Sequence, residues 1–551
     1  MNENSTWWKR FFIVFLVTLA AIGIWTAADY GMSWDYEWHE VYGRQVFSWY
    51  SSPSADHVAV TDWMRFYGPC FETLVNISRL LFPSADGISL KGSVTFLVGL
   101  SAAIPCYIIG SSISNRRAGF LAAVTLMLTP MYYGHSFINH KDLPFAAAYA
   151  WVLASVVALL NNIVPKLKHW IVVGIAFGIC LAVRVGGIML LPTIGLAWSH
   201  LTMSNGTKFR FDLKTALRNS CLFGIQLFVA YISMMALWPF ALVNPFTGPL
   251  EALRIGAAFP FTHPVLFEGQ QIPANLLPTR YLFVWFKVCL PEFFILGLAL
   301  ALIAGIYFIV SRRSLIWSRS TAQTLIVVCG AVLPVAAILV AKSTLYDAVR
   351  HLLFIVPPLA IISALGYEFF IRKLPQWPSN ALLTCIVLGW LVVLPDILAL
   401  HPYQYVYFNR LFGGGLKGAA GTFETDYWAT CMKDSVTWLK RHKTKLRPPF
   451  SVGGWSHPIQ IAGYLTPTSI NARGITYATD EATADIYLAS TRWNGHFKPY
   501  KKLHTIRRQG VPLCYIFDTR PYKVAIKKQA AAASELTPSS QTEKPADTTK
   551  R

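Results

Sequence analysis

Eleven apolar segments, each close to the length that crosses a bilayer, dominate this chain of 551 residues. A membrane-spanning helix needs about 20 predominantly apolar residues, because its backbone polar groups must all be satisfied inside the helix. The segments lie at approximately 11–28, 93–112, 118–134, 143–161, 168–182, 186–201, 219–240, 291–310, 321–341, 351–370 and 380–400. Hydrophobic residues make up 54% of the chain, above the roughly 45–50% of soluble domains. The pattern predicts a polytopic α-helical membrane protein with about 11 spans, and leaves open whether 168–201 forms two short helices or one broken helix.

The basic residues between these segments are unevenly distributed. Eleven spans place the two termini on opposite sides, and cytoplasmic loops carry an excess of Lys and Arg. One set of loops holds Lys9, Arg10, Arg116, Arg117, Lys166, Lys168, Lys208, Arg210, Lys214, Arg218, Arg312, Arg313, Arg319, Arg372 and Lys373. The short loops of the other set hold only Lys141, Arg184, Lys342 and Arg350. We therefore expect the N-terminus inside, and the loops 29–92 and 241–290, together with everything after 400, outside.

The chain divides into a membrane domain over 1–400 and a more polar region behind it. An amphipathic helix is expected over 37–47 in the first outer loop. Region 401–528 has the mixed periodicity of a small extracytoplasmic α/β domain, with a helix-like stretch over 427–442 and strand-like stretches over 484–489 and 513–517. Residues 529–551 are rich in Ala, Ser, Thr, Pro and Lys, and are expected to be a disordered tail.

The formal charge of +21 does not indicate nucleic-acid binding, because no zinc-finger or RNA-binding motif accompanies it. A basic protein facing anionic lipid explains it better. The nine cysteines show no metal-ligand spacing. Cys431 and Cys514 either pair in the outer region or remain buried thiols.

An acidic and aromatic motif, Ser33-Trp34-Asp35-Tyr36-Glu37-Trp38-His39-Glu40, follows the first span directly. A carboxylate at a membrane surface among aromatic side chains is partly desolvated, which suits it to act as a base. Asp35 is equally well placed to cap the next helix, with Glu37 in its first turn.

A second motif, His135-Ser136-Phe137-Ile138-Asn139-His140-Lys141-Asp142-Leu143-Pro144, forms the turn before the fourth span. It lies on the same expected side as Asp35. In a purely structural reading Asp142 caps the following helix and Pro144 occupies its first turn. The histidines also allow a divalent metal ion, although a spacing of five residues defines no ligand geometry.

Two arginines complete the group. Arg184 is alone between apolar stretches, where an ionisable residue marks a functional site unless it reaches the interface. Arg350 and His351 open the tenth span, where helical N–H groups favour anions and a guanidinium suits bidentate phosphate contact. An Asp347–Arg350 ion pair is the structural alternative. One topology thus places an acidic loop, a His-Lys-Asp turn and two arginines on one face.

These motifs resemble the C-type glycosyltransferase superfamily (the GT-C fold), and within it bacterial relatives of the dolichyl-phosphate-mannose–protein mannosyltransferases and the lipid A aminoarabinose transferases. The resemblance rests on Trp34-Asp35-Tyr36-Glu37, Lys141-Asp142-Leu143-Pro144, Val183-Arg184-Val185-Gly186, Arg350-His351-Leu352-Leu353-Phe354 with Pro357-Pro358, and 401–409. It implies that Asp35 is the base acting on the acceptor, with Glu37 as the alternative because Tyr36 separates two acids that several relatives place side by side. It implies Asp142 as a support for that centre or for a metal.

The resemblance implies transfer of a sugar from a polyprenyl-phosphate-type carrier at the extracytoplasmic face of a membrane, taken as a bacterial inner membrane. The candidate phosphate-binding residues are His140, Lys141, Arg184, Arg350 and His351. No cofactor is required by the pattern, and a metal site stays undefined. A transporter or lipid flippase is the alternative function, and a non-catalytic scaffold is a third. The sugar, the acceptor and the carrier length are not encoded in any motif.

Overall fold

The computed structural model describes residues 6–203, 211–257, 259–311, 318–465 and 474–535. The chain forms two compact units, Met1–Thr430 with Arg508–Val511, and Cys431–Arg507 with Pro512–Arg551. The expected boundary at 400 therefore differs from the observed one, because 401–430 pack within the first unit. Tyr405 illustrates this, since its hydroxyl contacts Asp426 and its ring lies 5.2 Å from that of Tyr427.

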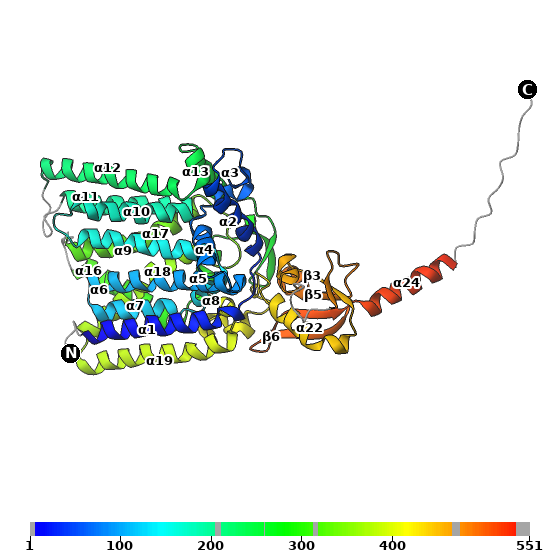
Figure 1. The fold of residues 1–551 in the computed structure, drawn as a ribbon. Coiled ribbons are helices and arrows are strands. Elements are labelled where there is room, and N and C mark those ends of the chain that lie inside the picture. Colours follow the sequence, from blue (N-terminus) through cyan, green and yellow to red (C-terminus); the bar gives the residue numbers. More distant parts are fainter. Residues whose placement is uncertain (1–5, 204–210, 258, 312–317, 466–473, 536–551) are drawn as a thin grey trace, which may run out of the picture. The chain divides into compact units, whose positions relative to one another are not determined.

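The first unit is a bundle of long apolar helices (Figure 1). Within the described residues, nine segments are long and apolar enough to cross a membrane. They are α1 with η1 (Thr6–Asp29), α5 with α6 (Gly87–Ile113), α9 (Asp142–Leu160), η3 with α11 (Val185–Met203), α12 (Leu213–Ala236), α16 (Glu292–Ser311), α17 (Arg319–Val340), η5 with α18 (Arg350–Lys373) and α19 (Gln376–Leu400). Lys208, Arg210, Arg312 and Arg313 of the expected inner loops lie outside the described residues.

The other two predicted spans have different forms. Helix α10 (Leu167–Val183) is apolar but shorter. Arg184 then adopts an extended conformation before η3 (Val185–Leu190), so 168–201 contains two helices and not one. The continuous span predicted over 118–134 is wrong. Helix α7 (Arg116–Met127) ends, and α8 (Pro130–Ile138) begins at Pro130, which has no N–H to continue the helix and restricts the residue before it.

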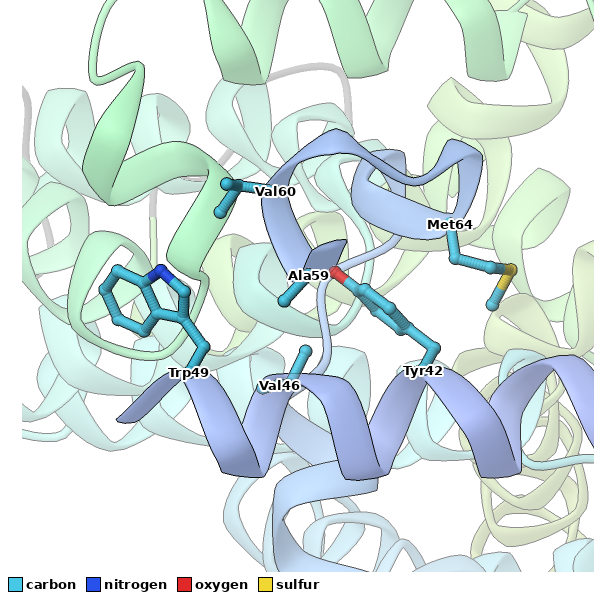
Figure 2. Close-up of a cluster of buried hydrophobic side chains, with 6 residues drawn as sticks. All are labelled: Tyr42, Val46, Trp49, Ala59, Val60 and Met64. Carbon is cyan, nitrogen blue, oxygen red and sulfur yellow. The ribbon is translucent and has the colours of Figure 1, made fainter. Parts of the chain in front are cut away.

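The first loop folds into helices α2 (Tyr36–Ser51), α3 (Val58–Thr61), η2 (Trp63–Phe66) and α4 (Cys70–Leu81). The amphipathic helix predicted over 37–47 is confirmed as α2. Its apolar face packs onto the following segment in a cluster of six buried side chains, which Figure 2 shows: Tyr42, Val46, Trp49, Ala59, Val60 and Met64. Figure 1 shows α2, α3 and α4 at one end of the bundle, together with α8 and α13 (Pro239–Val243).

The second long loop carries α14 (Gly248–Ala257), then a β-hairpin and α15 (Tyr281–Cys289). In the hairpin, β1 (Pro264–Phe267) pairs antiparallel with β2 (Gln270–Pro273). Glu268 and Gly269 form its turn with positive φ angles of 50° and 81°, the geometry of a tight two-residue turn.

The second unit is a small α/β fold, as the sequence predicts for the outer region. Its five strands are β3 (Phe450–Trp455), β4 (Ile475–Tyr477), β5 (Ile486–Ser490), β6 (Lys501–Arg508) and β7 (Val511–Asp518), in the order β4-β3-β5-β7-β6. Strand β3 runs parallel to β4 and β5, whereas β5 and β7 are antiparallel. Helix α22 (Met432–Leu446) starts later than the predicted 427.

Cys431 and Cys514 form a disulfide in this unit, which resolves the alternative left open by the sequence. Helix α24 (Arg520–Glu535) follows the sheet. The disordered tail predicted from 529 therefore begins with a helical stretch, because alanine has the highest helix propensity and 530–533 are all alanine. Residues 536–551 of that predicted tail lie outside the described part of the chain.

Candidate functional site

Asp35 occupies the cap position of α2 but does not cap it. No helical N–H is bonded by its side chain. Its Oδ2 atom lies 3.4 Å from Nζ of Lys141 and 3.7 Å from Nη1 of Arg350. Burial raises the pKa of Asp35, but Lys141 and then Arg350 more than offset this, so that its pKa lies below the ordinary value. Asp35 is therefore an ionised carboxylate held between two cations, with 20% of its side chain exposed.

Asp142 is placed by the turn that precedes α9. The Asp142 N–H donates to Oδ1 of Asn139 at 2.8 Å, and Nδ2 of Asn139 donates to Asp142 Oδ2 at 3.2 Å. Pro144 occupies the first turn of α9, as predicted. The Asp142 carboxylate makes an ion pair with Arg184 and lies 3.5 Å from Nη1 of Arg350. Its side chain thus joins two cations across the site.

Arg184 owes its position to the break between α10 and η3. Its extended backbone directs the guanidinium to Asp142, so the side chain is paired. About a quarter of it, 24%, stays exposed. Arg184 thus reaches a buried acid of another element, whereas simple snorkelling requires only that the guanidinium reach water.

Arg350 is almost completely buried at the start of η5 (Arg350–Ile355). Its Nε lies 3.1 Å from Oδ2 of Asp347, and the guanidinium also pairs with Asp35 and Asp142. Asp347 has a positive φ of 56°, a conformation that costs a non-glycine residue energy and persists where surrounding contacts enforce it. The predicted Asp347–Arg350 pair is thus present, and it coexists with the contacts to the other two acids.

Three cations and three carboxylates therefore form one network: Lys141, Arg184, Arg350, Asp35, Asp142 and Asp347. These groups come from the first loop, the turn before α9, the end of α10 and the start of η5. Five sequence-predicted site residues are brought together, although they are spread over more than 300 residues of the sequence: Asp35, Lys141, Asp142, Arg184 and Arg350. Their formal charges cancel, which makes burial of the group tolerable.

A cavity of about 320 Å³ adjoins this network. Lys141, Arg184 and His351 contribute its cationic or potentially cationic groups, with Tyr67 and Tyr346 beside them. The rest of the wall is mostly apolar and comes mainly from η3, α14, α17 and η5, with Phe259 from the segment after α14: Val185, Met189, Ala252, Leu253, Ile255, Ala257, Phe259, Ala337, Ile338 and Phe354 among others. A cavity with a few polar groups at one side of an apolar wall suits an amphiphile.

The remaining predicted histidines have different surroundings. His351 lines the cavity, and its buried Nδ1 has no hydrogen-bond partner among the described residues. The Nδ1 atom of His140 instead bonds the Thr95 hydroxyl at 2.9 Å, and burial lowers the pKa of His140 well below its ordinary value. His135 bonds the Tyr427 hydroxyl at 2.9 Å. The two histidines of the turn are thus engaged with different elements, and His140 is not brought to the cavity wall.

Glu37 lies in the first turn of α2 and is half-buried. Neither Glu37 nor Asp35 lines the cavity, and the ion pairs with Lys141 and Arg350 are made by Asp35. Asp35 and Asp142 supply the carboxylates that a divalent metal would use. Lys141, Arg184 and Arg350 already pair with these two carboxylates.

Sequence reasoning missed the aromatic and helical parts of the site. The centre of the Tyr67 ring lies 4.9 Å from Nζ of Lys141, and the centre of the Trp428 ring lies 5.3 Å from Cζ of Arg350. Both are long-range contacts with no local motif. Helix α14, which forms much of the apolar wall, carries a weak signal in its amphipathic pattern.

No family model and no curated protein matches the chain. Among solved structures, the chain is similar to ArnT from Cupriavidus metallidurans bound to undecaprenyl phosphate, with 12% identity, a TM-score of 0.48, and coverage of 93% of this chain and 98% of that one. It is also similar to the oligosaccharyltransferase AglB from Archaeoglobus fulgidus in complex with an inhibitory peptide and a dolichol-phosphate. There the identity is 12%, the TM-score 0.45, and the coverage 88% of this chain and 70% of that one.

Proposed function

We propose that the chain is a glycosyltransferase that moves a sugar from a polyprenyl-phosphate-type carrier to an acceptor at the extracytoplasmic face of the membrane. The observation that carries the proposal is the charged network beside a mostly apolar cavity. A lipid phosphate needs cationic contacts for its head and an apolar wall for its first isoprene units, and the cavity offers both side by side.

In this proposal Arg184 and Lys141 bind the phosphate, with His351 beside them on the cavity wall. Arg350 is not proposed to bind the phosphate. It pairs with Asp35 and Asp142 and holds both carboxylates in place. These cations would offset the charge that develops on the phosphate as it leaves, an electrostatic contribution that pre-placed groups supply efficiently.

Asp35 is proposed to take the proton from the acceptor. It is ionised and keeps part of its side chain exposed, so it is available to a hydroxyl that approaches from outside the cavity. Its ion pairs fix the carboxylate in one place, which favours a defined direction of attack. The sugar would then pass directly from phosphate to acceptor.

A transporter or flippase is the competing function. Its substrate site would be expected near the middle of the bilayer, between two related halves. Here the charged side chains all sit at helix ends: Asp142 begins α9, Arg184 follows α10 and Arg350 begins η5. This placement favours chemistry at one face of the bundle.

The test is sugar transfer from synthetic polyprenyl-phosphate sugars by the purified chain in liposomes, comparing Asp35→Asn with Glu37→Gln. We expect Asp35→Asn to lower kcat by about 10²-fold or more, the scale of a lost general base. Glu37→Gln is the matched control, because it removes the neighbouring acid and should retain most of the activity. Near-normal turnover by Asp35→Asn, or loss only in Glu37→Gln, would contradict the assignment of Asp35.

A further inference from the structure

A second pair of ionisable side chains lies next to the proposed site and is not part of its network. Nδ1 of His39, on α2, is 2.6 Å from Oε1 of Glu72, on α4. Both side chains are almost fully buried. A carboxylate on one ring nitrogen fixes the orientation and tautomer of an imidazole, which leaves Nε2 to exchange a proton.

The pair is one helical turn from Asp35. The His39 N–H donates to the Asp35 carbonyl at 3.3 Å, and residues four apart project from the same face of a helix. A close approach of α2 to α4 supports this arrangement. A Cβ atom added at Gly43, one turn beyond His39, would lie only 3.0 Å from Cβ of Glu72.

Four titratable groups surround His39. Glu72 comes from α4, Asp35 from the start of α2, and His140 from the turn before α9. The ring of Tyr67 lies 6.3 Å away, and the same ring is 4.9 Å from Nζ of Lys141. His39 therefore lies between Glu72 of the first loop and Asp35 of the charged network.

The proposed transfer releases a proton that Asp35 is poorly suited to keep. Lys141 and Arg350 both stabilise its ionised form, so a protonated Asp35 would be short-lived. Imidazole is ordinarily the stronger base, with a pKa near 6.5 against about 3.9 for an aspartate. The imidazole of His39 lies one turn away from Asp35 and can accept that proton.

We propose that His39, oriented by Glu72, receives the proton that Asp35 takes from the acceptor. The inference rests on the proposed function. The acceptor hydroxyl oxygen forms the bond to the anomeric carbon, and the bond from that carbon to the phosphate oxygen breaks, with its electron pair leaving on the phosphate. The hydroxyl proton passes to Asp35 and then to Nε2 of His39, while Nδ1–H donates to Glu72. His39 acts through Asp35 and does not contact the substrate, so it is a positioning and proton-accepting residue.

The experiment measures kcat between pH 5 and 8, and the Kd for polyprenyl phosphate, in the full-length chain and in three variants. We expect His39→Gln to lower kcat by about 10²-fold or more at pH 7. His39 can accept the proton only while its ring is neutral, so the wild-type rate should rise as the pH rises, and His39→Gln should lose that rise. Glu72→Gln keeps a hydrogen-bonding side chain, so its kcat should lie between those of the wild type and of His39→Gln. The Kd of both variants for polyprenyl phosphate should stay within about twofold of the wild-type value.

His401→Gln is the matched control, because His401 also pairs with a carboxylate, Asp29, at 2.9 Å. It should keep both kcat and the pH profile. The inference is overturned if His39→Gln keeps the wild-type kcat and pH profile. It is also overturned if kcat falls equally at every pH together with weaker polyprenyl-phosphate binding, because that combination indicates a structural role. A wild-type chain with no transfer would instead refute the proposed function itself.

Discussion

Arg350 contacts three carboxylates, whereas Arg184 lines the cavity. The two arginines share Asp142 but differ in burial, with 3% and 24% of their side chains exposed. Burying a charge is tolerable only with partners in place, so a deep residue such as Arg350 has a structural role in addition to any binding role. Arg184 keeps donors available for a ligand.

The two arginines should therefore respond differently to truncation. Arg184→Ala should weaken polyprenyl-phosphate binding about 10- to 100-fold, the scale of a lost charged hydrogen bond. The unfolding temperature should change little, because Asp142 remains paired with Arg350. Arg350→Ala should lower the free energy of unfolding by about 3–5 kcal/mol, since it leaves buried acids unpaired. Binding assays and thermal unfolding in detergent measure both. An Arg184→Ala variant that binds normally would remove Arg184 from the phosphate site.

At the scale of elements, the site depends on how firmly α2 is held against its neighbours. The cluster in Figure 2 fixes one face of α2, and the Glu40–Arg79 ion pair, with a shortest N–O distance of 2.5 Å, joins α2 to α4. Lys91 of α5 reaches the same Glu40 at 3.5 Å. Asp35 stands at the start of this anchored helix, so its position relative to Lys141 follows from the packing of α2.

Gly43→Ala tests that packing. The added methyl group should push α2 and α4 apart and cost about 1–3 kcal/mol of stability, as overpacking usually does, with a parallel loss of transfer activity. Gly224→Ala is the matched control, because nothing lies within 4 Å of a Cβ added there in helix α12, and alanine favours a helix over glycine. Thermal unfolding of both variants checks the prediction. Equal stability of Gly43→Ala and the wild type would show that the α2–α4 contact does not constrain the loop.

Some elements of the structure could be predicted from the sequence and others could not. Apolar runs and charged turns are local signals, so the long helices, α2 and the residues of the charged network were predictable. Pro130 was a visible stop signal that the span predicted over 118–134 overlooked. The packing of 401–430 into the first unit and the His39–Glu72 pair were not predictable, because each depends on residues that meet only after folding. The wall formed by α14 is a tertiary feature of the same kind.

At the scale of the whole molecule, the account requires the charged network to face the extracytoplasmic side. The distribution of basic residues between the loops predicts this orientation. The Cys431–Cys514 disulfide in the second unit agrees with the prediction that the chain after residue 400 lies outside, since disulfides persist mainly in oxidising compartments. In Figure 1 the first-loop helices share one end of the bundle with α8, beside the turn that carries Asp142. The donor lipid is thus expected to enter at that end.

The most direct measurement is a density map of the full-length chain with a polyprenyl phosphate. The account predicts phosphate density within hydrogen-bonding distance of Arg184 and Lys141, and an isoprene chain along the apolar wall between α14 and α17. Asp35 should remain beside the phosphate without ligating it. Lipid phosphate bound away from this cavity, with Arg184 still paired only to Asp142, would contradict the account.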